Sequence, residues 1–398
     1  MGRSRVIFIN RVYHPSQAAT AQLLTDLAEG LARRGWPVHV IATGEKSGEL
    51  QGVTIHRTGK GDQHGGLISR ARNYWRFIRR AREELARLVQ PGDVVVVMTD
   101  PPLLGAALTG IANRRSARVI HWIQDIYPEI VTAHLGVLLG WPLFPLKIKR
   151  DTAWQAAHRC VVLGETMARQ VASQGVPRDR LAVIPNWAPR ELQAAATPAE
   201  IAAQRADWGV ANKFVIAYSG NLGRVHEFNA IIEAAAALQT QTEIIFLFIG
   251  TGARLADVRS AVQVNQLRNV RFLPPAPREK LAASLAAADV QLVTLKPAFA
   301  PLVYPSKLAG VLAAGRPVIF IGPCDGEIAQ LLEREGCGDA VAPENGVQLG
   351  EILTEWYTDS AHRSRMGQQA RLAYEKHFTA EAAIARWEEI LGSAVISQ

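Results

Sequence analysis

The stretch VYPSKLAGVLAAGRPVIFIG, Val303 to Gly322, joins the signals of a short helix to those of a buried strand. Pro305 is suited to the first turn of a helix, and the hydroxyl of Ser306 can cap free backbone amides there. Gly315 and Pro317 end the helix, and the apolar run VIFI follows at once. Such a run is typical of a parallel strand that is covered on both faces. The stretch therefore predicts an α/β protein.

The same alternation of strands and helices runs along the chain. The strands expected before residue 190 are RVIFIN, PVHVIATG, DVVVVMT, RVIHWIQD, RCVVLG and RLAVIPNW, and those expected after residue 212 are KFVIAYSG, EIIFLFIG, NVRFLP, DVQLVTL and PVIFIG. Helical segments, among them 19–34, 69–89 and 103–114, alternate with them, and 362–391 is helical and amphipathic. We predict two doubly wound α/β domains, with ligands at the carboxyl ends of the strands. Their expected bounds are 1–190 and 213–375, with a linker at 191–212 and a C-terminal helix at 376–398 that returns to the N-terminal domain.

Length and cysteine content narrow the class of protein. The chain has 398 residues, which is long for one hydrophobic core and favours two domains. Its three cysteines, Cys160, Cys324 and Cys337, have no metal-site spacing and are odd in number. This pattern fits a reducing compartment better than a disulfide framework. No apolar run reaches the roughly 18 residues of a membrane span, and the N-terminal VIFI is too short for a signal sequence. We expect a cytoplasmic protein.

Positive charge is concentrated in the first half of the chain. Residues 1–190 hold 26 Lys and Arg against 14 Asp and Glu, a net +12, whereas the remainder carries 18 against 22, a net −4. The window Ile68–Val89 contains seven arginines: Arg70, Arg72, Arg76, Arg79, Arg80, Arg82 and Arg87. A helix there would place an apolar stripe on one face: Ala71, Trp75, Ile78, Leu85 and Val89.

Two interpretations of this half remain open. The arginines together with Trp75 and Phe77 are typical of a helix lying on an anionic membrane, which we favour. Alternatively, they only keep a surface helix in water. The Pro-broken apolar run HLGVLLGWPLFPL, residues 134–146, is either a docking loop or core.

Three strand-end turns in the second half carry the residues of an anion site. The first, in AYSGNLGRVHEF, brings Arg224 and His226, and the second, in FLFIGTGARL, is a Gly-x-Gly turn. The third is the helix start at Ser306, where Lys307 adds a cation to the free amides. Glycine lets the backbone approach a phosphate closely, and arginine recognises phosphate with a planar fork. Together the turns predict a bound diphosphate. The chain lacks GxxxxGK[ST] and GxGxxG, which argues against a P-loop ATPase and a standard dinucleotide fold.

The order of these strings resembles that of the retaining glycosyltransferases of family 4, which have the GT-B fold. The strand before SGN, then FIGTG, NVRFLP and YPSK…LAAGRPV follow one another as in that family. In the first half, VYHPSQAATAQLLTDLAEGLARRGWPVHVIATG, HWIQDIYPE and VIPNW fall where the family has similar strings. The resemblance covers nearly the whole chain and is strongest to bacterial enzymes of exopolysaccharide and O-antigen assembly. It implies two Rossmann-like domains facing a central cleft.

The resemblance also implies an activity. We expect the retaining transfer of a hexosyl or N-acetylhexosaminyl group from a nucleotide diphosphate-sugar, in which the nucleotide is UDP. The acceptor would be linked to a polyprenyl diphosphate at the inner leaflet of the plasma membrane, in lipopolysaccharide or other polysaccharide biosynthesis. No other cofactor, no metal and no nucleic acid are expected, because cations and a helix dipole would stabilise the leaving diphosphate and no Asp-x-Asp motif occurs.

The resemblance also implies which residues form the site. Donor-binding candidates are Gly220, Asn221, Arg224, His226, Gly250, Gly252, Leu273, Tyr304, Ser306 and Lys307. The phosphates would meet Arg224, Ser306 and Lys307, and the base would lie by Gly250, Gly252 and Leu273. Catalytic candidates are His121, Asp125 in QDIYPE, which matches an aspartate of the family, and Arg224. A lone strand histidine such as His121 is more often a core residue; in a cleft it could contact the reacting sugar.

This chain departs from the family pattern at several positions. Asn221 and His226 replace the Arg and Lys that the family has five apart, with Arg224 between them. Leu302 and Gly310 stand where the family has a Glu-x7-Glu pair, and residues 18–20, Ala-Ala-Thr, replace the usual glycines of the first loop. Two further functions are therefore carried as alternatives: a non-catalytic, membrane-associated subunit that binds nucleotide-sugars, or another GT-B enzyme such as a nucleotide-sugar epimerase.

Overall fold

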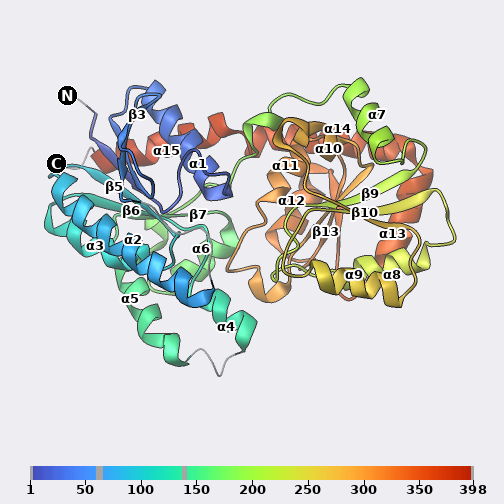
Figure 1. Ribbon diagram of the computed structural model, residues 1–398, viewed down its shortest axis with the longest axis horizontal. Helices are drawn as coiled ribbons and strands as arrows, with labels where there is room; N and C mark the ends of the chain where they lie inside the picture. Colours follow the sequence, from blue (N-terminus) through green and yellow to red (C-terminus); the bar gives the residue numbers. More distant parts are fainter. Residues whose placement is uncertain (1–2, 60–65, 137–140, 396–398) are drawn as a thin grey trace. The chain divides into compact units, whose positions relative to one another are not determined.

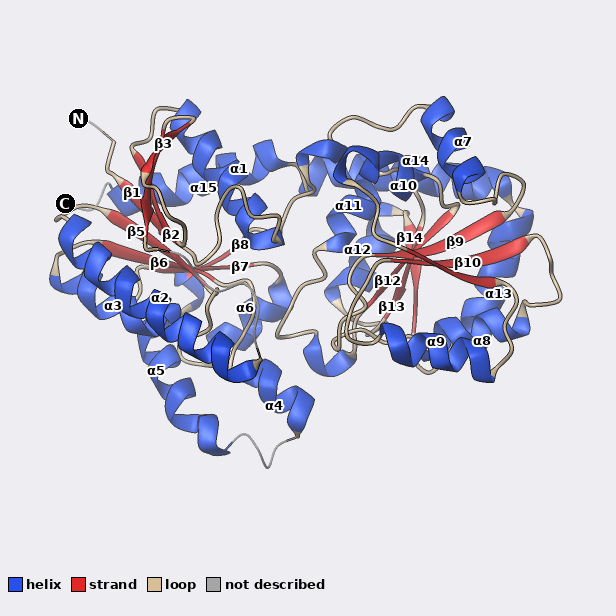
Figure 2. Ribbon diagram, in the orientation of Figure 1, coloured by secondary structure: helices blue, strands red, loops and turns tan. Residues whose placement is uncertain are grey.

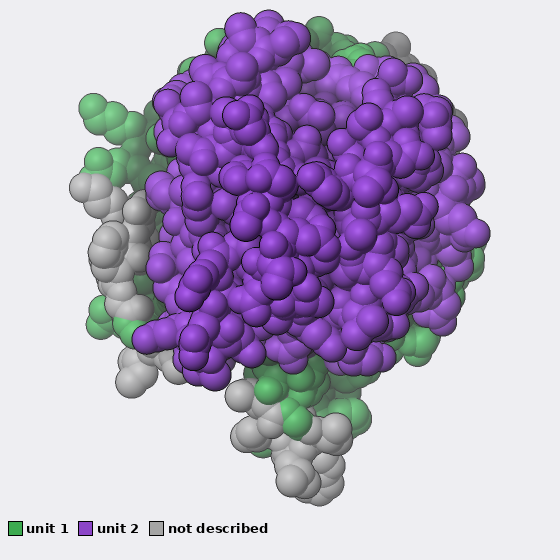
Figure 3. Space-filling view, turned by 90° about the vertical axis from the view of Figure 1, so that its right-hand side faces the viewer, with its two compact units in different colours: residues 1–185, 301–304, 380–398 green, residues 186–300, 305–379 purple. Residues whose placement is uncertain are grey.

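The computed structural model describes residues 3–59, 66–136 and 141–395, which form two compact α/β units. Unit 1 comprises residues 1–185, 301–304 and 380–398, and unit 2 comprises 186–300 and 305–379 (Figure 3). Each unit has its own sheet with helices on both faces (Figures 1 and 2). The predicted fold class, two doubly wound Rossmann-like domains, is confirmed.

The sheet of unit 1 has the strand order β3-β4-β2-β1-β5-β6-β7-β8 in the described part of the chain. Its strands are β1 (Val6–Ile9), β2 (Val38–Ala42), β3 (Gly48–Leu50), β4 (Val53–Arg57), β5 (Val94–Met98), β6 (Arg118–Trp122), β7 (Arg159–Val162) and β8 (Leu181–Val183). All pairs are parallel except β3–β4, a hairpin that the apolar-run signal did not reveal because β3 is polar and exposed. The strand order of the sheet changes direction at β1. Because β1, β5 and β6 are parallel, their carboxyl ends lie at the same edge of the sheet.

The helices of unit 1 are α1 (Ala19–Arg33), α2 (Leu67–Leu88), α3 (Leu104–Arg114), α4 (Glu129–Leu135), α5 (Phe144–Gln155), α6 (Glu165–Ala172) and α15 (Ala380–Val395). The C-terminal α15 lies in this unit because it packs on α1 and supplies core. Trp387 is fully buried with its ring centroid 5.0 Å from that of Trp122, and Glu388 accepts a hydrogen bond from the Trp36 indole at 3.0 Å.

The sheet of unit 2 has the order β11-β10-β9-β12-β13-β14, with parallel pairs throughout its described strands. They are β9 (Phe214–Ser219), β10 (Ile244–Ile249), β11 (Val270–Leu273), β12 (Val290–Thr294), β13 (Val318–Ile321) and β14 (Gly338–Val341). Alternate residues face two separate cores: Ile216 and Phe246 lie in one, and Ala217 and Leu247 lie in the other. Burial on both faces explains why the strands read as unbroken apolar runs.

The helices of unit 2 are α7 (Pro198–Asp207), α8 (Asn229–Ala237), α9 (Leu255–Val264), α10 (Leu281–Ala286), α11 (Lys307–Ala313), α12 (Glu327–Glu335), α13 (Gly346–Thr358) and α14 (Ser360–His377). The segment predicted to be helical over 362–391 consists of two helices, because the chain breaks at Phe378 and Thr379. The break separates α14 of unit 2 from α15 of unit 1.

The segment 191–212, predicted to be a linker, lies within unit 2, and Pro198–Asp207 of it form the ordered helix α7. The Thr197 hydroxyl accepts a hydrogen bond from the Glu200 amide at 3.3 Å, and the Glu200 carboxylate accepts one from the Thr197 amide at 2.8 Å. This capping box, with Pro198 at the first helical position, was readable in the string TPAE. Its Ala-rich surroundings only looked like a linker.

The apolar stripe of α2 differs from the predicted one. The buried side chains are Phe77, Ala81 and Leu85, followed by Val89 at the end of the helix, whereas Trp75 is 63% exposed. Ala71 is exposed as well. The spacing of four between Phe77, Ala81 and Leu85 fixes the buried face, so Trp75 lies on the outer surface beside Arg79, whose guanidinium carbon is 5.6 Å from its ring centroid.

We predict that Trp387→Ala destabilises unit 1 by about 3–5 kcal/mol, because it leaves a cavity beside Trp122 in a fully buried site. Trp75→Ala is the matched control: its ring is mostly exposed, so the free energy of unfolding should change by no more than about 0.5 kcal/mol. Urea unfolding monitored by fluorescence measures both. Equal effects of the two substitutions would contradict the assignment of α15 to the core.

Candidate active site

Two glycine turns of unit 2 touch backbone to backbone at the carboxyl ends of β9 and β10. A Cβ atom at Gly250 would lie 2.0 Å from the Gly220 carbonyl oxygen, and one at Gly252 would lie 2.4 Å from that of Leu222. All three glycines have positive φ angles, between 130° and 154°. Leu222 and Gly250 are further joined to Thr251 and Leu273 by backbone hydrogen bonds of 2.8 and 3.0 Å. The structure thus brings the glycines and Leu273 together at one edge of the sheet.

Lys307, the first residue of α11, points its side chain at this edge. Its Nζ lies 3.5 Å from the centroid of the Tyr218 ring and 3.6 Å from the place where a Gly220 Cβ would stand. Nζ is buried and has no hydrogen-bond partner among the described residues, and burial lowers the pKa of this amine well below its ordinary value. The hydroxyl of Ser219, next along β9, is likewise buried without a partner in the described part of the chain. A shielded cation without an acceptor is costly, so the edge is prepared for an anion.

The basic residues of the turn after β9 are arranged differently from what the family resemblance implied. His226 is buried, and its Nδ1 lies 2.6 Å from the Thr294 carbonyl oxygen, to which it must donate. Burial, followed by the charge of Lys307, lowers the pKa of His226 to about 3, so the ring is neutral at pH 7. Its geometry ties the turn to β12. Arg224 is exposed, and the described residues offer it no hydrogen bond or ion pair. Arg224 and Lys307 therefore remain as the cations at this edge.

The start of α11 does not have the expected cap. Ser306 is exposed in a helical conformation, and its side chain makes no capping bond. Gly310 is buried, and a Cβ there would face Leu192 at 3.2 Å, so this position offers no group to a ligand. Leu302 and Tyr304 belong to unit 1, because the segment 301–304 pairs with the QDIYPE loop, whereas the other donor candidates belong to unit 2.

Asp125 of unit 1 lies just beyond the carboxyl end of β6. It forms an isolated antiparallel bridge with Val303, and the neighbouring Ile126 amide donates to the Leu302 carbonyl at 2.9 Å. Burial, and secondly the charge of Asp100, raise the pKa of the Asp125 carboxyl from 3.8 to about 6. Asp100 follows β5 and is held by Arg11 at 2.9 Å. A carboxylate with a pKa near neutrality can accept a proton or a hydrogen bond from a substrate hydroxyl.

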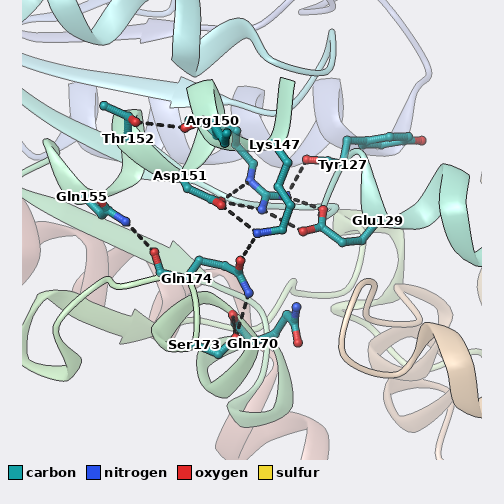
Figure 4. Close-up of polar contacts among 11 residues, drawn as sticks. Tyr127, Glu129, Lys147, Arg150, Asp151, Thr152, Gln155, Gln170, Ser173 and Gln174 are labelled. Atoms are coloured by element: carbon teal, nitrogen blue, oxygen red, sulfur yellow. Dashed lines mark hydrogen bonds and ion pairs between the residues drawn. The ribbon is translucent and has the colours of Figure 1, made fainter. Parts of the chain in front are cut away.

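A buried arginine of α5 holds the loop that carries Asp125 (Figure 4). Arg150 donates to the Tyr127 carbonyl at 2.6 Å and forms ion pairs with Glu129 and Asp151. Its guanidinium carbon also lies 4.1 Å from the centroid of the Trp154 ring. The role of Arg150 was not predictable from the sequence, because an arginine within a helix is ordinarily a surface residue.

His121 lies in the core of unit 1. It is 3% exposed, its Nε2 is 3.1 Å from the Thr109 hydroxyl, and a Cβ at Gly105 would collide with the ring. Burial lowers the pKa of His121 to about 4. Its ring therefore packs between β6 and α3, which favours the core interpretation of this histidine over contact with a sugar.

The described residues contain neither a cluster of metal ligands nor a helix that could span a membrane. No group of three or more His, Cys, Asp or Glu side chains is placed to hold a metal ion within residues 3–59, 66–136 and 141–395. In those same ranges no helix combines the length and the apolar character needed to cross a bilayer. Residues 137–140 of the apolar run at 134–146 lie outside the described residues, whereas Phe144, Leu146 and Ile148 of α5 are exposed.

Comparison with known proteins defines the class. The family model for Glycosyltransferase Family 4 matches residues 20–191, and that for Glycosyl transferases group 1 matches residues 200–373. The chain is 27% identical over 277 residues to the probable glycosyltransferase WbjE of Pseudomonas aeruginosa, an alignment that spans 68% of each protein. It is 31% identical over 243 residues to the putative colanic acid biosynthesis glycosyl transferase WcaI of Escherichia coli (strain K12), across 59% of each.

The fold has solved counterparts. The crystal structure of Anabaena Alr3699/HepE in complex with UDP-glucose superposes with a TM-score of 0.74 at 16% identity, covering 98% of this chain and 99% of that one. Two Rossmann-like units with these matches define a glycosyltransferase of the GT-B fold. The N-terminal half of the chain belongs to Glycosyltransferase Family 4, and its C-terminal half belongs to Glycosyl transferases group 1.

We predict opposite effects of Asp125→Asn on stability and activity. A carboxyl whose pKa is raised in the folded protein stabilises the fold while protonated, and this contribution is lost as the pH rises from about 4 through about 6. At pH 7.5 the neutral amide should therefore raise the free energy of unfolding, by up to about 3 kcal/mol. At pH 4 it should change little. Transferase activity should fall in the same variant.

Unfolding of the wild type and Asp125→Asn at both pH values, with activity measured alongside, tests this prediction. Asp179→Asn is the control, because Asp179 is an exposed carboxylate of the same unit. A stabilisation that does not depend on pH, or full activity of Asp125→Asn, would refute the assignment.

Proposed function

We propose that this protein is a retaining, metal-independent glycosyltransferase that moves a sugar from a UDP-sugar to a lipid-linked acceptor in cell-surface polysaccharide assembly. One observation carries the donor assignment: the buried Nζ of Lys307, without a hydrogen-bond partner among the described residues, next to the Gly220 turn. WcaI is named as a putative colanic acid biosynthesis glycosyl transferase, and the HepE structure contains UDP-glucose. They support the same substrate classes here.

A bound diphosphate would supply acceptors for the unpartnered hydrogen-bond donors at this edge of the sheet. Its oxygens would accept hydrogen bonds from Lys307 and Ser219, and Arg224 could reach them from the exposed turn. Lys307 also takes over a charge that the family places at position 226, where this chain has a neutral histidine. The cation thus comes from α11 instead of from the turn after β9.

The chemistry requires charge stabilisation above all. The bond between the anomeric carbon and the β-phosphate oxygen breaks, and the electron pair goes to the leaving diphosphate. Two protein cations at that position stabilise the developing charge, which is a role that a metal ion fills in other transferases. The acceptor oxygen forms the new bond from the face that the leaving group occupied, and its proton leaves with the diphosphate or with a carboxylate. Asp125 is a carboxylate with a pKa suited to this second route.

We predict that Lys307→Met and Arg224→Ala each weaken UDP binding by about 10- to 150-fold, the equivalent of a charge-assisted hydrogen bond of roughly 1.5–3 kcal/mol. Because burial lowers the pKa of Lys307, binding of a diphosphate should also take up protons, and UDP affinity should fall as the pH rises. Calorimetry in two buffers of different ionisation enthalpy measures both effects. Both titrations, and the release of UDP from UDP-sugars, are run with EDTA present.

Arg268→Gln is the control, since this arginine is exposed in the same unit and away from the three turns. Unchanged affinity in Lys307→Met would refute the diphosphate site. A strict requirement for magnesium or manganese, seen as loss of UDP release in EDTA, would refute the metal-independent mechanism.

The acceptor half of the proposal depends on the surface of unit 1. Arg72, Trp75, Arg79 and Arg82 recur on the face of α2 opposite the buried Phe77, Ala81 and Leu85. Arg80 does not belong to this face, because it donates to the Thr58 carbonyl at 2.7 Å. Exposed apolar side chains on α5, with Phe144 at 58% and Ile148 at 49%, flank the lysines Lys147 and Lys149. Apolar and basic groups in this combination suit the interface of an anionic membrane.

We predict that the chain binds vesicles containing anionic lipid and that binding weakens as salt rises, because each basic residue near the surface contributes about 1 kcal/mol. Replacing Arg72, Arg79 and Arg82 together with Gln should reduce sedimentation with the vesicles several-fold. The matched control removes the same charge from unit 2, by replacing Arg268, Arg334 and Arg365. Equal losses in the two triple variants, or no binding at low salt, would refute a membrane surface on α2.

A further inference from the structure

Unit 2 contains a cavity of about 390 Å³ at the opposite edge of its sheet from the donor candidates. It opens beside Asp289 and Pro317, the residues that precede β12 and β13. The donor candidates follow the carboxyl ends of the strands, so in a parallel sheet the two places are separated by the length of the strands. The cavity is large enough for a small ligand.

Three arginines line this cavity: Arg316, Arg363 and Arg371. The lining contains one carboxylate, Asp289, which is already engaged by Arg205 at 3.1 Å and by the Val215 amide at 2.8 Å. The Ser360 and Ser364 hydroxyls of α14 add hydrogen-bond donors. Arg371 is already paired with Glu375 at 2.8 Å, so the lining is positive through Arg316 and Arg363, and its single negative charge is committed to other groups.

Arg316 is the side chain of this cavity that a bound anion would stabilise most. Its Nε is buried and has no hydrogen-bond partner among the described residues. Burial lowers the pKa of this guanidinium, the nearby charge of Asp289 acts in the opposite direction, and Arg205 opposes ionisation again. Leaving the Nε–H of a guanidinium unpaired in a shielded site is unfavourable.

The walls of the cavity are fixed by the backbone. Gly367 of α14 packs on the turn after α11, where a Cβ at Gly367 would lie 2.6 Å from the Gly315 carbonyl oxygen. Arg371 donates to the Ala313 carbonyl at 2.8 Å and so joins α14 to the end of α11. Arg363 donates to the Tyr357 carbonyl at 3.0 Å and lies over the Phe214 ring. Two of the arginines are thus held in place by their neighbours, which limits the entropy that a ligand must remove.

We propose that this cavity is a second anion site, one that binds a compact phosphate-bearing ligand separate from the sugar donor. Phosphate is the chemistry that fits best, because a guanidinium fork matches its oxygens in pairs and several arginines can share one group. The volume leaves room for more than a single orthophosphate. The site uses no residue of the proposed donor site, so the two proposals stand or fall separately.

Thermal unfolding with inorganic pyrophosphate, at ionic strength held constant with sodium chloride, tests the proposal. The experiment uses Lys307→Met, in which the donor edge has lost a cation, alongside the wild type. The unfolding temperature of both should rise with pyrophosphate concentration, because a ligand that binds only the folded state stabilises it. In the Lys307→Met background, Arg316→Gln should abolish this rise, whereas the exposed Arg268→Gln should retain it.

A second variant covers the case in which Arg316→Gln fails to fold. Ser364→Asp places a carboxylate among the arginines, so it should fold at least as well as the wild type and no longer respond to pyrophosphate. Glycerol 3-phosphate distinguishes the source of the phosphate: a larger response to it than to pyrophosphate indicates an organic phosphate ester. An unchanged response in Arg316→Gln and Ser364→Asp, or no response in any protein at constant ionic strength, would overturn the proposal.

Discussion

The close approach of two glycine turns is the constraint on which the donor edge of unit 2 depends. Any side chain at Gly250 would collide with the Gly220 carbonyl, and the positive φ angles of both residues exclude other residue types on a second ground. The backbone hydrogen bond from Leu222 to Thr251, at 2.8 Å, then fixes the first turn relative to the second. Because the turns are locked to each other, the place beside Tyr218 into which Lys307 reaches has a defined shape before any ligand arrives.

Charge buried without full compensation marks both units. In unit 2 the Lys307 amine has no acceptor among the described residues, and in unit 1 Asp125 is shielded near a second carboxylate, Asp100. Each arrangement disfavours the charged form and so costs stability. Arg150 is the contrasting case, since its charge is shielded but matched by Glu129 and Asp151. Lys307 and Asp125, by contrast, lie near the carboxyl ends of strands, where substrates of α/β proteins bind.

The sequence was sufficient for the architecture because apolar runs and glycine turns are local signals. It placed the strands of both sheets apart from β3, β4 and β14, and it identified the turns at Gly220, Gly250 and Ser306 as candidate parts of a site. The capping box at Thr197 was also readable and was missed. Features that depend on contacts between distant segments were not readable: the outward direction of Trp75, the core position of His121 and the burial of Arg150. Each is decided by which neighbour packs against a residue, and a single sequence does not contain that information.

The way in which the chain passes between the units limits how such a protein can be recombined. Unit 1 takes its last pieces from residues 301–304 and 380–398, so neither unit is one continuous stretch of chain. A hybrid that joins the first 185 residues to the second half of a relative would receive a foreign partner for Ile126 and Asp125, and a foreign helix against Trp122. We therefore expect unit 2 to be exchangeable between relatives only when the exchanged segment excludes residues 301–304 and 380–398. Among natural relatives, we expect the four-residue segment and the last helix to vary together with the N-terminal half of the gene, although they are encoded in the other half.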